Sequence, residues 1–137
     1  MNKTVFVDTS GFYALLVRSD SKHQKAADIL RQASKDKRHF VTSDYILDET
    51  ATLFQSRGLA HLVPHVFDSV FTSKACLVAW MDQERFLKTR EFFVKHADQL
   101  WSFTDCASFI IMKEMKLSLA LTTDRHFQKA GFTPVLL

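Results

Sequence analysis

Short hydrophobic segments alternate along this chain with longer segments of helical periodicity, and this alternation constrains the fold more than any other feature. The segments with the character of strands are 4–7, 39–41, 75–80, 118–121 and 133–136. Only three Gly and two Pro occur in 137 residues, so signals for hairpin turns are scarce. Strands that are separated by helices rather than by hairpins favour an α/β sandwich around a mainly parallel sheet.

Helices are expected between these strands, where apolar residues recur with the spacing of one helix face. Their ranges are 12–17, 21–35, 44–56, 59–71, 82–97 and 102–115. Ser21, Asp82 and Ser102 stand at the start of three of these segments and are expected to cap the helices that follow. The segment 102–115 is apolar on nearly every side, so this helix is expected to pack between other elements.

Residues 1–137 are expected to form one domain, because the length suits a single domain and no repeat or linker divides the chain. Eighteen Lys and Arg against fifteen Asp and Glu give a net charge of +3, which allows a phosphate-bearing partner without requiring one. There are two cysteines without a CxxC spacing, no signal peptide, and no apolar run near the ~20 residues that span a bilayer. These features predict a cytoplasmic protein with no membrane association.

Two acidic residues, Asp8 and Asp124, come at or just after the ends of predicted strands. Folds of this kind bind ligands at the carboxyl ends of their strands, which gives both side chains a candidate functional role. Each also has a simpler explanation as the cap of a following helix, and Thr9 or Ser10 could cap in place of Asp8. Position alone leaves both roles open.

Two further acids lie on predicted helices. The spacing of Ile46, Glu49 and Leu53 puts Glu49 on or beside a buried face, where a carboxylate needs a partner or a metal. The alternatives for Glu49 are a buried ion pair or a position at the rim. Asp105 is in the first turn after Ser102, so a capping box is its alternative role. Because this helix is expected to be packed, its N-terminus can open into a cleft rather than bulk water.

These four acids together carry more information than any one of them alone. Clustered carboxylates raise one another's pKa values unless a cation is present. Carboxylate oxygens suit Mg²⁺ or Mn²⁺, which favour phosphate substrates and can generate an attacking hydroxide. The residues therefore favour metal-dependent hydrolysis of a phosphodiester.

Four stretches of the chain carry a wider pattern: 5–10 (VFVDTS), 43–49 (SDYILDE), 101–109 (WSFTDCASF) and 121–127 (LTTDRHF). Together they resemble the PIN domain, and more closely the VapC-type ribonuclease toxins of toxin–antitoxin pairs. The similarity extends over essentially the whole chain, and the stretch 101–106 is its most specific part. The resemblance implies a three-layer α/β/α fold with a central parallel sheet, and an endoribonuclease that depends on Mg²⁺ or Mn²⁺.

The resemblance also assigns site residues and partners. It places the family's four acidic positions on Asp8, Glu49, Asp105 and Asp124. Asp8 and Asp105 match the positions that hold the metal most directly, and Glu49 and Asp124 match those that complete the site or orient its waters. Small polar positions that support water or phosphate fall on Thr9 and Ser102. The implied partners are an RNA substrate and a small antitoxin that docks near the site, and homodimers are common.

Two other functions stay open at this stage. One is an RNA- or protein-binding module that does not cut, although bare carboxylates repel phosphate. The other is a stand-alone RNA-processing nuclease that has no antitoxin. Arg125 and His126 could contact a substrate phosphate, with a solvated loop as the simpler explanation. The aromatic residues Phe92, Phe93, Phe103 and Phe109 are expected to form core or dimer surface.

Overall fold

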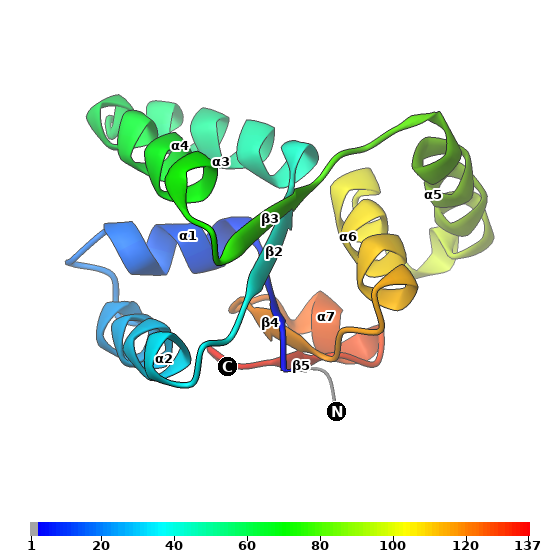
Figure 1. Cartoon of the computed structure of the whole chain (residues 1–137). Helices are drawn as coiled ribbons and strands as arrows, with labels where there is room; N and C mark the ends of the chain where they lie inside the picture. The colour runs from blue at the N-terminus through cyan, green and yellow to red at the C-terminus, as the bar shows by residue number, and fades with distance from the viewer. Residues whose placement is uncertain (1–2) are drawn as a thin grey trace.

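A parallel β-sheet lies at the centre of the fold, as the computed structural model of residues 3–137 shows (Figure 1). Its strands are β1 (Val5–Val7), β2 (Phe40–Ser43), β3 (Cys76–Ala79), β4 (Leu119–Leu121) and β5 (Thr133–Pro134). They lie in the order β3-β2-β1-β4-β5, and every neighbouring pair is parallel. The expected α/β sandwich with a mainly parallel sheet is confirmed.

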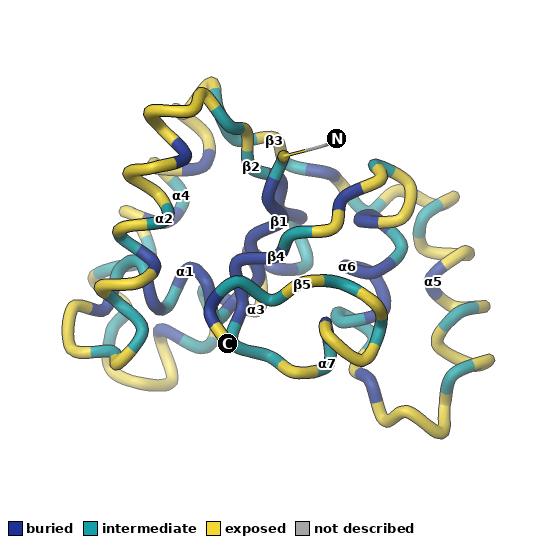
Figure 2. The backbone as a smooth tube through the Cα atoms, turned by 90° about the horizontal axis from the view of Figure 1, so that it is seen from below, coloured by how far each residue is buried: buried dark blue, intermediate teal, exposed yellow. Residues whose placement is uncertain are grey.

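Helices cover both faces of the sheet (Figures 1 and 2). One layer holds α1 (Thr9–Leu16), α2 (His23–Lys35), α3 (Asp44–Ser56) and α4 (Val63–Thr72), and the other holds α5 (Gln83–Lys95), α6 (Phe103–Glu114) and α7 (Arg125–Lys129). The chain steps outward from β1 to β3 and then returns past β1 to β4. Because crossovers between parallel strands are right-handed, this reversal moves the later helices to the opposite face.

The core is centred on β1, the middle strand. Val5, Phe6 and Val7 are all buried, as a strand covered on both faces requires. The packed helix α6 contributes a second set of buried side chains, namely Cys106, Ala107, Ser108, Phe109, Ile111 and Met112. Figure 2 shows this burial along β1, β4 and α6, while α2 and α5 expose most of their outer surface. No helix in the part of the chain that the structure describes has the length and apolar character needed to cross a membrane.

Three helix starts differ from those expected. Helix α1 begins at Thr9 rather than at Phe12, because the chain enters the helix directly after Asp8. Helix α2 begins at His23 rather than after Ser21, because the Asp20 carboxylate accepts the Lys22 N–H in a turn that precedes the helix. The segment 59–71 is not one helix: a 3₁₀ turn, η1 (Ala60–Leu62), comes first and α4 follows. Pro64 lies in the first turn of α4, the only part of a helix where its missing N–H and its ring are tolerated.

Two strands and one helix are shorter than expected. The third strand covers Cys76–Ala79 at the sheet edge, and the fifth covers only Thr133–Pro134. Helix α5 ends at Lys95 and is followed by a second 3₁₀ turn, η2 (Ala97–Gln99). The predicted caps at Asp82 and Ser102 are confirmed, since each side chain accepts a backbone N–H of its helix.

Gly11 is where α1 comes closest to the sheet. A Cβ added there would lie 2.2 Å from the Leu121 carbonyl oxygen, which belongs to the backbone of β4. We expect Gly11→Ala to lower the free energy of unfolding by roughly 1–3 kcal/mol, because the helix must move off the strand. Urea unfolding would measure this change.

A matched control is Gln32→Ala, which puts the same residue at an exposed position of α2. This variant should match or slightly exceed the wild type in stability, since Ala favours helix. A stable Gly11→Ala protein would contradict the close packing of α1 on β4.

Candidate active site

Asp8 lies at the carboxyl end of β1 and is almost completely buried, with 6% of its surface exposed. It occupies the N-cap position of α1, but its side chain makes no capping hydrogen bond. Its carboxylate instead accepts the Thr122 hydroxyl at 2.8 Å and the Ser10 hydroxyl at 3.4 Å. Because Thr122 directly follows β4, the Asp8 side chain joins the ends of two neighbouring strands.

Burial raises the pKa of the Asp8 carboxyl from its ordinary 3.8 to about 7. The hydrogen bonds from the Thr122 hydroxyl and the Thr9 backbone act in the opposite direction, while the negative charges of Asp105 and Glu49 raise the pKa further. Ionised Asp8 is therefore poorly compensated by its protein neighbours. A cation bound beside it would remove this deficit.

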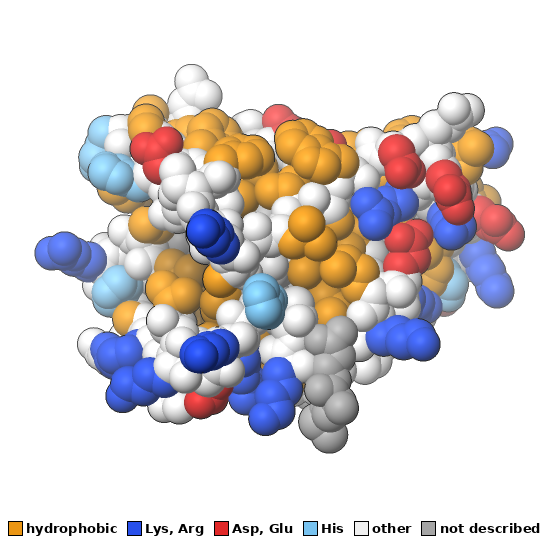
Figure 3. Space-filling view, in the orientation of Figure 1, with side chains coloured by type: hydrophobic (Ala, Val, Ile, Leu, Met, Phe, Trp, Pro, Cys, Tyr) orange, Lys and Arg blue, Asp and Glu red, His pale blue; other side chains and the backbone are white. Residues whose placement is uncertain are grey.

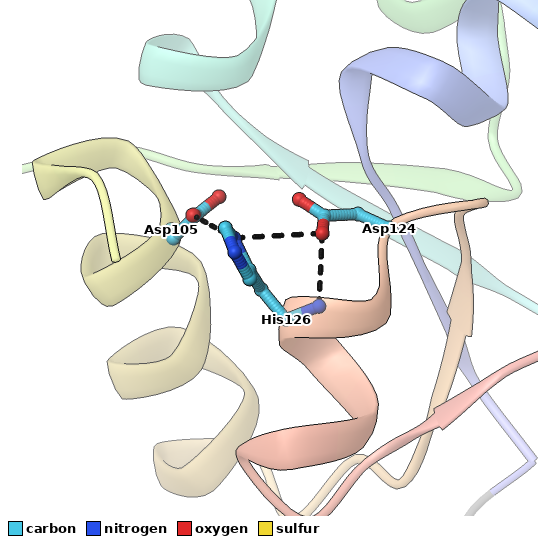
Figure 4. A group of neighbouring side chains, drawn as sticks. All are labelled: Asp105, Asp124 and His126. Atoms are coloured by element: carbon cyan, nitrogen blue, oxygen red, sulfur yellow. Dashed lines mark hydrogen bonds and ion pairs between the residues drawn. The ribbon is translucent and has the colours of Figure 1, made fainter. Parts of the chain in front are cut away.

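Asp105, Asp124 and His126 form a second group (Figure 4). One ligand atom from each of the three lies within 4.8 Å of the others. His126 Nδ1 is 3.1 Å from Asp105 Oδ2 and 3.5 Å from Asp124 Oδ1. Since a carboxylate only accepts, an Nδ1–H of His126 donates to Asp105. The two carboxylates, from α6 and from the loop before α7, thus face one another across an imidazole.

Both aspartates of this group also take part in helix capping, Asp124 as the N-cap of α7 and Asp105 as the third residue of α6. Asp105 Oδ2 accepts the Ser102 N–H at 3.2 Å, while the Ser102 hydroxyl accepts the Asp105 N–H at 3.0 Å. This reciprocal pair is a capping box. Asp124 Oδ1 accepts the His126 N–H at 2.8 Å at the start of α7. The capping roles considered from the sequence are therefore real, and they coexist with the clustering of the two carboxylates.

Glu49 has a different environment. It is exposed, whereas Ile46 and Thr50 on the same helix are fully buried, so it lies beside the buried face of α3 rather than on it. Its Oε1 accepts the Thr9 hydroxyl at 2.6 Å, and Thr9 in turn accepts the Thr50 hydroxyl at 3.3 Å. The rim position is thus correct for Glu49, and the buried ion pair is wrong.

A cavity of about 480 Å³ opens over these residues. Three of the four predicted acids line it: Asp8, Glu49 and Asp124. The fourth, Asp105, is close enough for its charge to raise the pKa of Asp8, and its side chain is only 15% exposed. All four predicted acids are thus brought to one region of the molecule.

The two predicted supporting residues are separated. Thr9 bonds to Glu49 in the cavity, whereas Ser102 is exposed and its hydroxyl is engaged in the cap of α6. The sequence analysis did not identify Thr122 as a partner of Asp8, nor did it place His126 between two acids. The position of Thr122 could have identified it as a neighbour of Asp8, since Thr122 directly follows β4 just as Asp8 directly follows β1.

Comparisons with known proteins identify the family and the relatives of this chain. The sequence model of the PIN domain family matches residues 5–133. The 23S rRNA-specific endonuclease VapC20 of Mycobacterium tuberculosis is 30% identical to this chain over 131 residues, which cover 96% of this chain and 97% of that protein. The crystal structure of M. tuberculosis VapC20, described as a sarcin–ricin-loop-cleaving toxin, has a TM-score of 0.81 and 27% identity. It aligns over 94% of this chain and 96% of its own.

The raised pKa of Asp8 makes stability depend on pH and on cations. In the unfolded chain this carboxyl loses its proton near pH 3.8, but in the folded protein it keeps it up to about pH 7. The folded state binds more protons in this interval, so stability falls as pH rises through it. Above pH 7 without metal, Asp8→Asn should raise the free energy of unfolding by roughly 1–4 kcal/mol.

Urea unfolding of both proteins in EDTA, from pH 4 to pH 8, measures this difference. Added Mn²⁺ should stabilise the wild type and have little effect on Asp8→Asn, because a ligand that binds only the folded state stabilises it. Equal or lower stability of the variant at pH 8 in EDTA would contradict the burial of an uncompensated charge.

Proposed function

This chain belongs to the PIN domain family and is a VapC-type endoribonuclease, and we propose that it cuts the sarcin–ricin loop of 23S rRNA with the help of Mg²⁺ or Mn²⁺. The observation that carries the proposal is the convergence of three carboxylates, those of Glu49, Asp105 and Asp124, on a buried Asp8, in a chain that aligns with almost the whole of a 23S rRNA endonuclease. A ribosomal substrate also supports a cytoplasmic location.

The donor set fits a hard divalent cation. Asp105 and Asp124 present carboxylate oxygens within 4.8 Å of one another, Asp8 lines the same cavity as Asp124, and the protein itself offers Asp8 too little positive charge. We propose that Asp8 and Asp105 hold the metal, while Glu49 and Asp124 complete the site and orient its waters. When bound, a divalent cation there supplies charge neutralisation for the scissile phosphodiester and acidifies a bound water.

The residues around the acids keep them in place. The Thr122 hydroxyl orients the Asp8 carboxylate, and the Thr9 hydroxyl orients that of Glu49. Ser102 donates its N–H to the Asp105 carboxylate and accepts the Asp105 N–H with its hydroxyl, so the capping box fixes the first turn of α6. These donors hold the negative charges in position without neutralising them, so the site keeps its attraction for a cation.

We further propose a VapB-type antitoxin as a protein partner, with a homodimer as a second form of assembly. Exposed aromatic surface supports a protein partner: Phe71 and Trp80 are each 56% exposed and stack on one another at 6.4 Å. Figure 3 shows hydrophobic side chains gathered over β3 and α4 on this face. Surface of this kind is typical of protein–protein contact.

The test of the nuclease is cleavage of an RNA oligonucleotide that carries the sarcin–ricin loop, by purified protein without a partner. With Mn²⁺ or Mg²⁺ we expect discrete fragments, and with EDTA none. Asp105→Asn should lower the cleavage rate about 100-fold or more, because a proposed carboxylate ligand of the metal is lost. Fragment mapping on a sequencing gel measures both the rate and the cleavage position.

Asp98→Asn is the matched control, since Asp98 is an exposed aspartate of η2 outside the cavity. It should cut at the wild-type rate. Cleavage that survives EDTA, or an Asp105→Asn protein that is fully active, would refute the proposed site. Cleavage of other RNA but not of this loop would refute the proposed substrate alone.

A further inference from the structure

We propose that Arg57, held on the ring of Tyr13 and assisted by Lys22, binds a phosphate of the RNA strand next to the one that is cut. The inference rests on the proposed nuclease function and adds a positioning site to it. It concerns the part of the cavity that lies beyond the acids and is lined by other residues.

The cavity that opens over the acids extends to two cationic side chains. Lys22 and Arg57 line it together with Tyr13 and Leu53. Glu49, Leu53 and Arg57 follow one another on α3 at intervals of four residues, and all three line the cavity. Since an α-helix rises 1.5 Å per residue, Arg57 lies about 12 Å along the helix axis from Glu49. An extended strand at the acids can therefore reach Arg57.

The position of Arg57 is fixed from two directions. Its guanidinium carbon lies 4.8 Å from the centre of the Tyr13 ring, a cation–π contact. The Tyr13 ring packs edge-on against the fully buried Phe54 at 5.6 Å. Helix α3 ends at Ser56 with Arg57 as its C-cap residue, and Gly58 then turns the chain with a φ of +74° while Leu59 donates its N–H to the Phe54 carbonyl. A long side chain at a helix end is thus held in a defined place.

Neither cation is neutralised by the protein. Within residues 3–137, no carboxylate forms an ion pair with Arg57 or Lys22, although Asp20 and Glu49 line the same cavity. Stacking on Tyr13 leaves the N–H groups of the guanidinium edge available to an anion. A phosphate oxygen pair matches this planar fork.

An RNA strand is the occupant that the charges favour. Its phosphates repeat along the chain, so when one lies at the acids a neighbouring one needs positive charge nearby. The acids alone repel such a strand, and the unpaired Arg57 and Lys22 lower this repulsion on one side of the site. An acidic segment of a protein is the competing occupant.

The test is binding of an RNA oligonucleotide carrying the sarcin–ricin loop, followed by fluorescence anisotropy in EDTA over a range of KCl concentrations. Arg57→Gln should weaken binding roughly fivefold to tenfold and reduce the slope of log affinity against log salt by about 0.7 to 0.9, the value for one lost phosphate contact. In the cleavage assay with Mn²⁺, KM should rise by a similar factor while kcat stays within about twofold.

Matched variants distinguish the effect of the Arg57 charge from that of the Tyr13 ring and from a general effect of removing an arginine. Arg90→Gln removes an exposed arginine of α5 in the opposite helical layer and should change neither affinity nor salt slope. Arg57→Lys should recover part of the affinity, because the charge returns without the planar fork. Tyr13→Phe should bind like the wild type, whereas Tyr13→Leu should weaken binding in the same direction as Arg57→Gln.

Several results would overturn the inference. One is wild-type affinity and salt slope in Arg57→Gln, and another is a loss of affinity that leaves the slope unchanged. A third is a polyglutamate peptide that binds the wild type but not Arg57→Gln, with RNA binding unaffected. If the wild type binds the RNA through Arg57 but does not cut it with Mn²⁺, the subsite stands and the nuclease proposal fails. If the wild type cuts the RNA and Arg57→Gln binds and cuts it like the wild type, the nuclease proposal stands and the subsite is refuted.

Discussion

The buried carboxylate of Asp8 is the constraint on which the rest of the site depends. It ends the central strand, where α1 crosses so close to β4 that position 11 has no room for a side chain. Among residues 3–137, the donors that face it are the hydroxyls of Thr122 and Ser10 and the Thr9 backbone, and the nearby charges of Asp105 and Glu49 are of the same sign as its own. In the absence of a cation this arrangement costs stability at neutral pH, and the same deficit of positive charge makes the site attract a divalent metal.

Helix capping and site geometry use the same atoms. Asp105 and Asp124 each start a helix with one carboxylate oxygen, and each faces His126. A cap of this kind contributes about 1 kcal/mol to stability. It also removes rotational freedom from the carboxylate that it employs, so the first turns of α6 and α7 hold these acids toward one another. Substitutions at either position therefore affect folding and metal affinity together.

The cavity joins two kinds of charge along one helix. Glu49 near the middle of α3 and Arg57 at its end line the same opening, with the cation resting on the Tyr13 ring. A polyanion approaches acids only where positive charge lies beside them, whether from a metal or from a side chain. The cavity thus has the mixed charge that a site for a phosphodiester strand needs, even though the chain as a whole is only mildly basic.

From the sequence alone, the order of the strands and of the longer helices could be predicted, and four acids could be proposed as site residues, because strand and helix periodicity and the ends of parallel strands are local signals. It could also predict the caps at Asp82 and Ser102, which involve neighbours three residues apart. Tertiary structure decided the rest. Asp8 bonds to a hydroxyl 114 residues away and does not cap the helix that follows it, Glu49 turns to the cavity rim, and His126 lies between two acids from different elements. Such contacts depend on which helical layer covers a residue and which strand ends beside it. The local periodicity of a sequence carries no information on either.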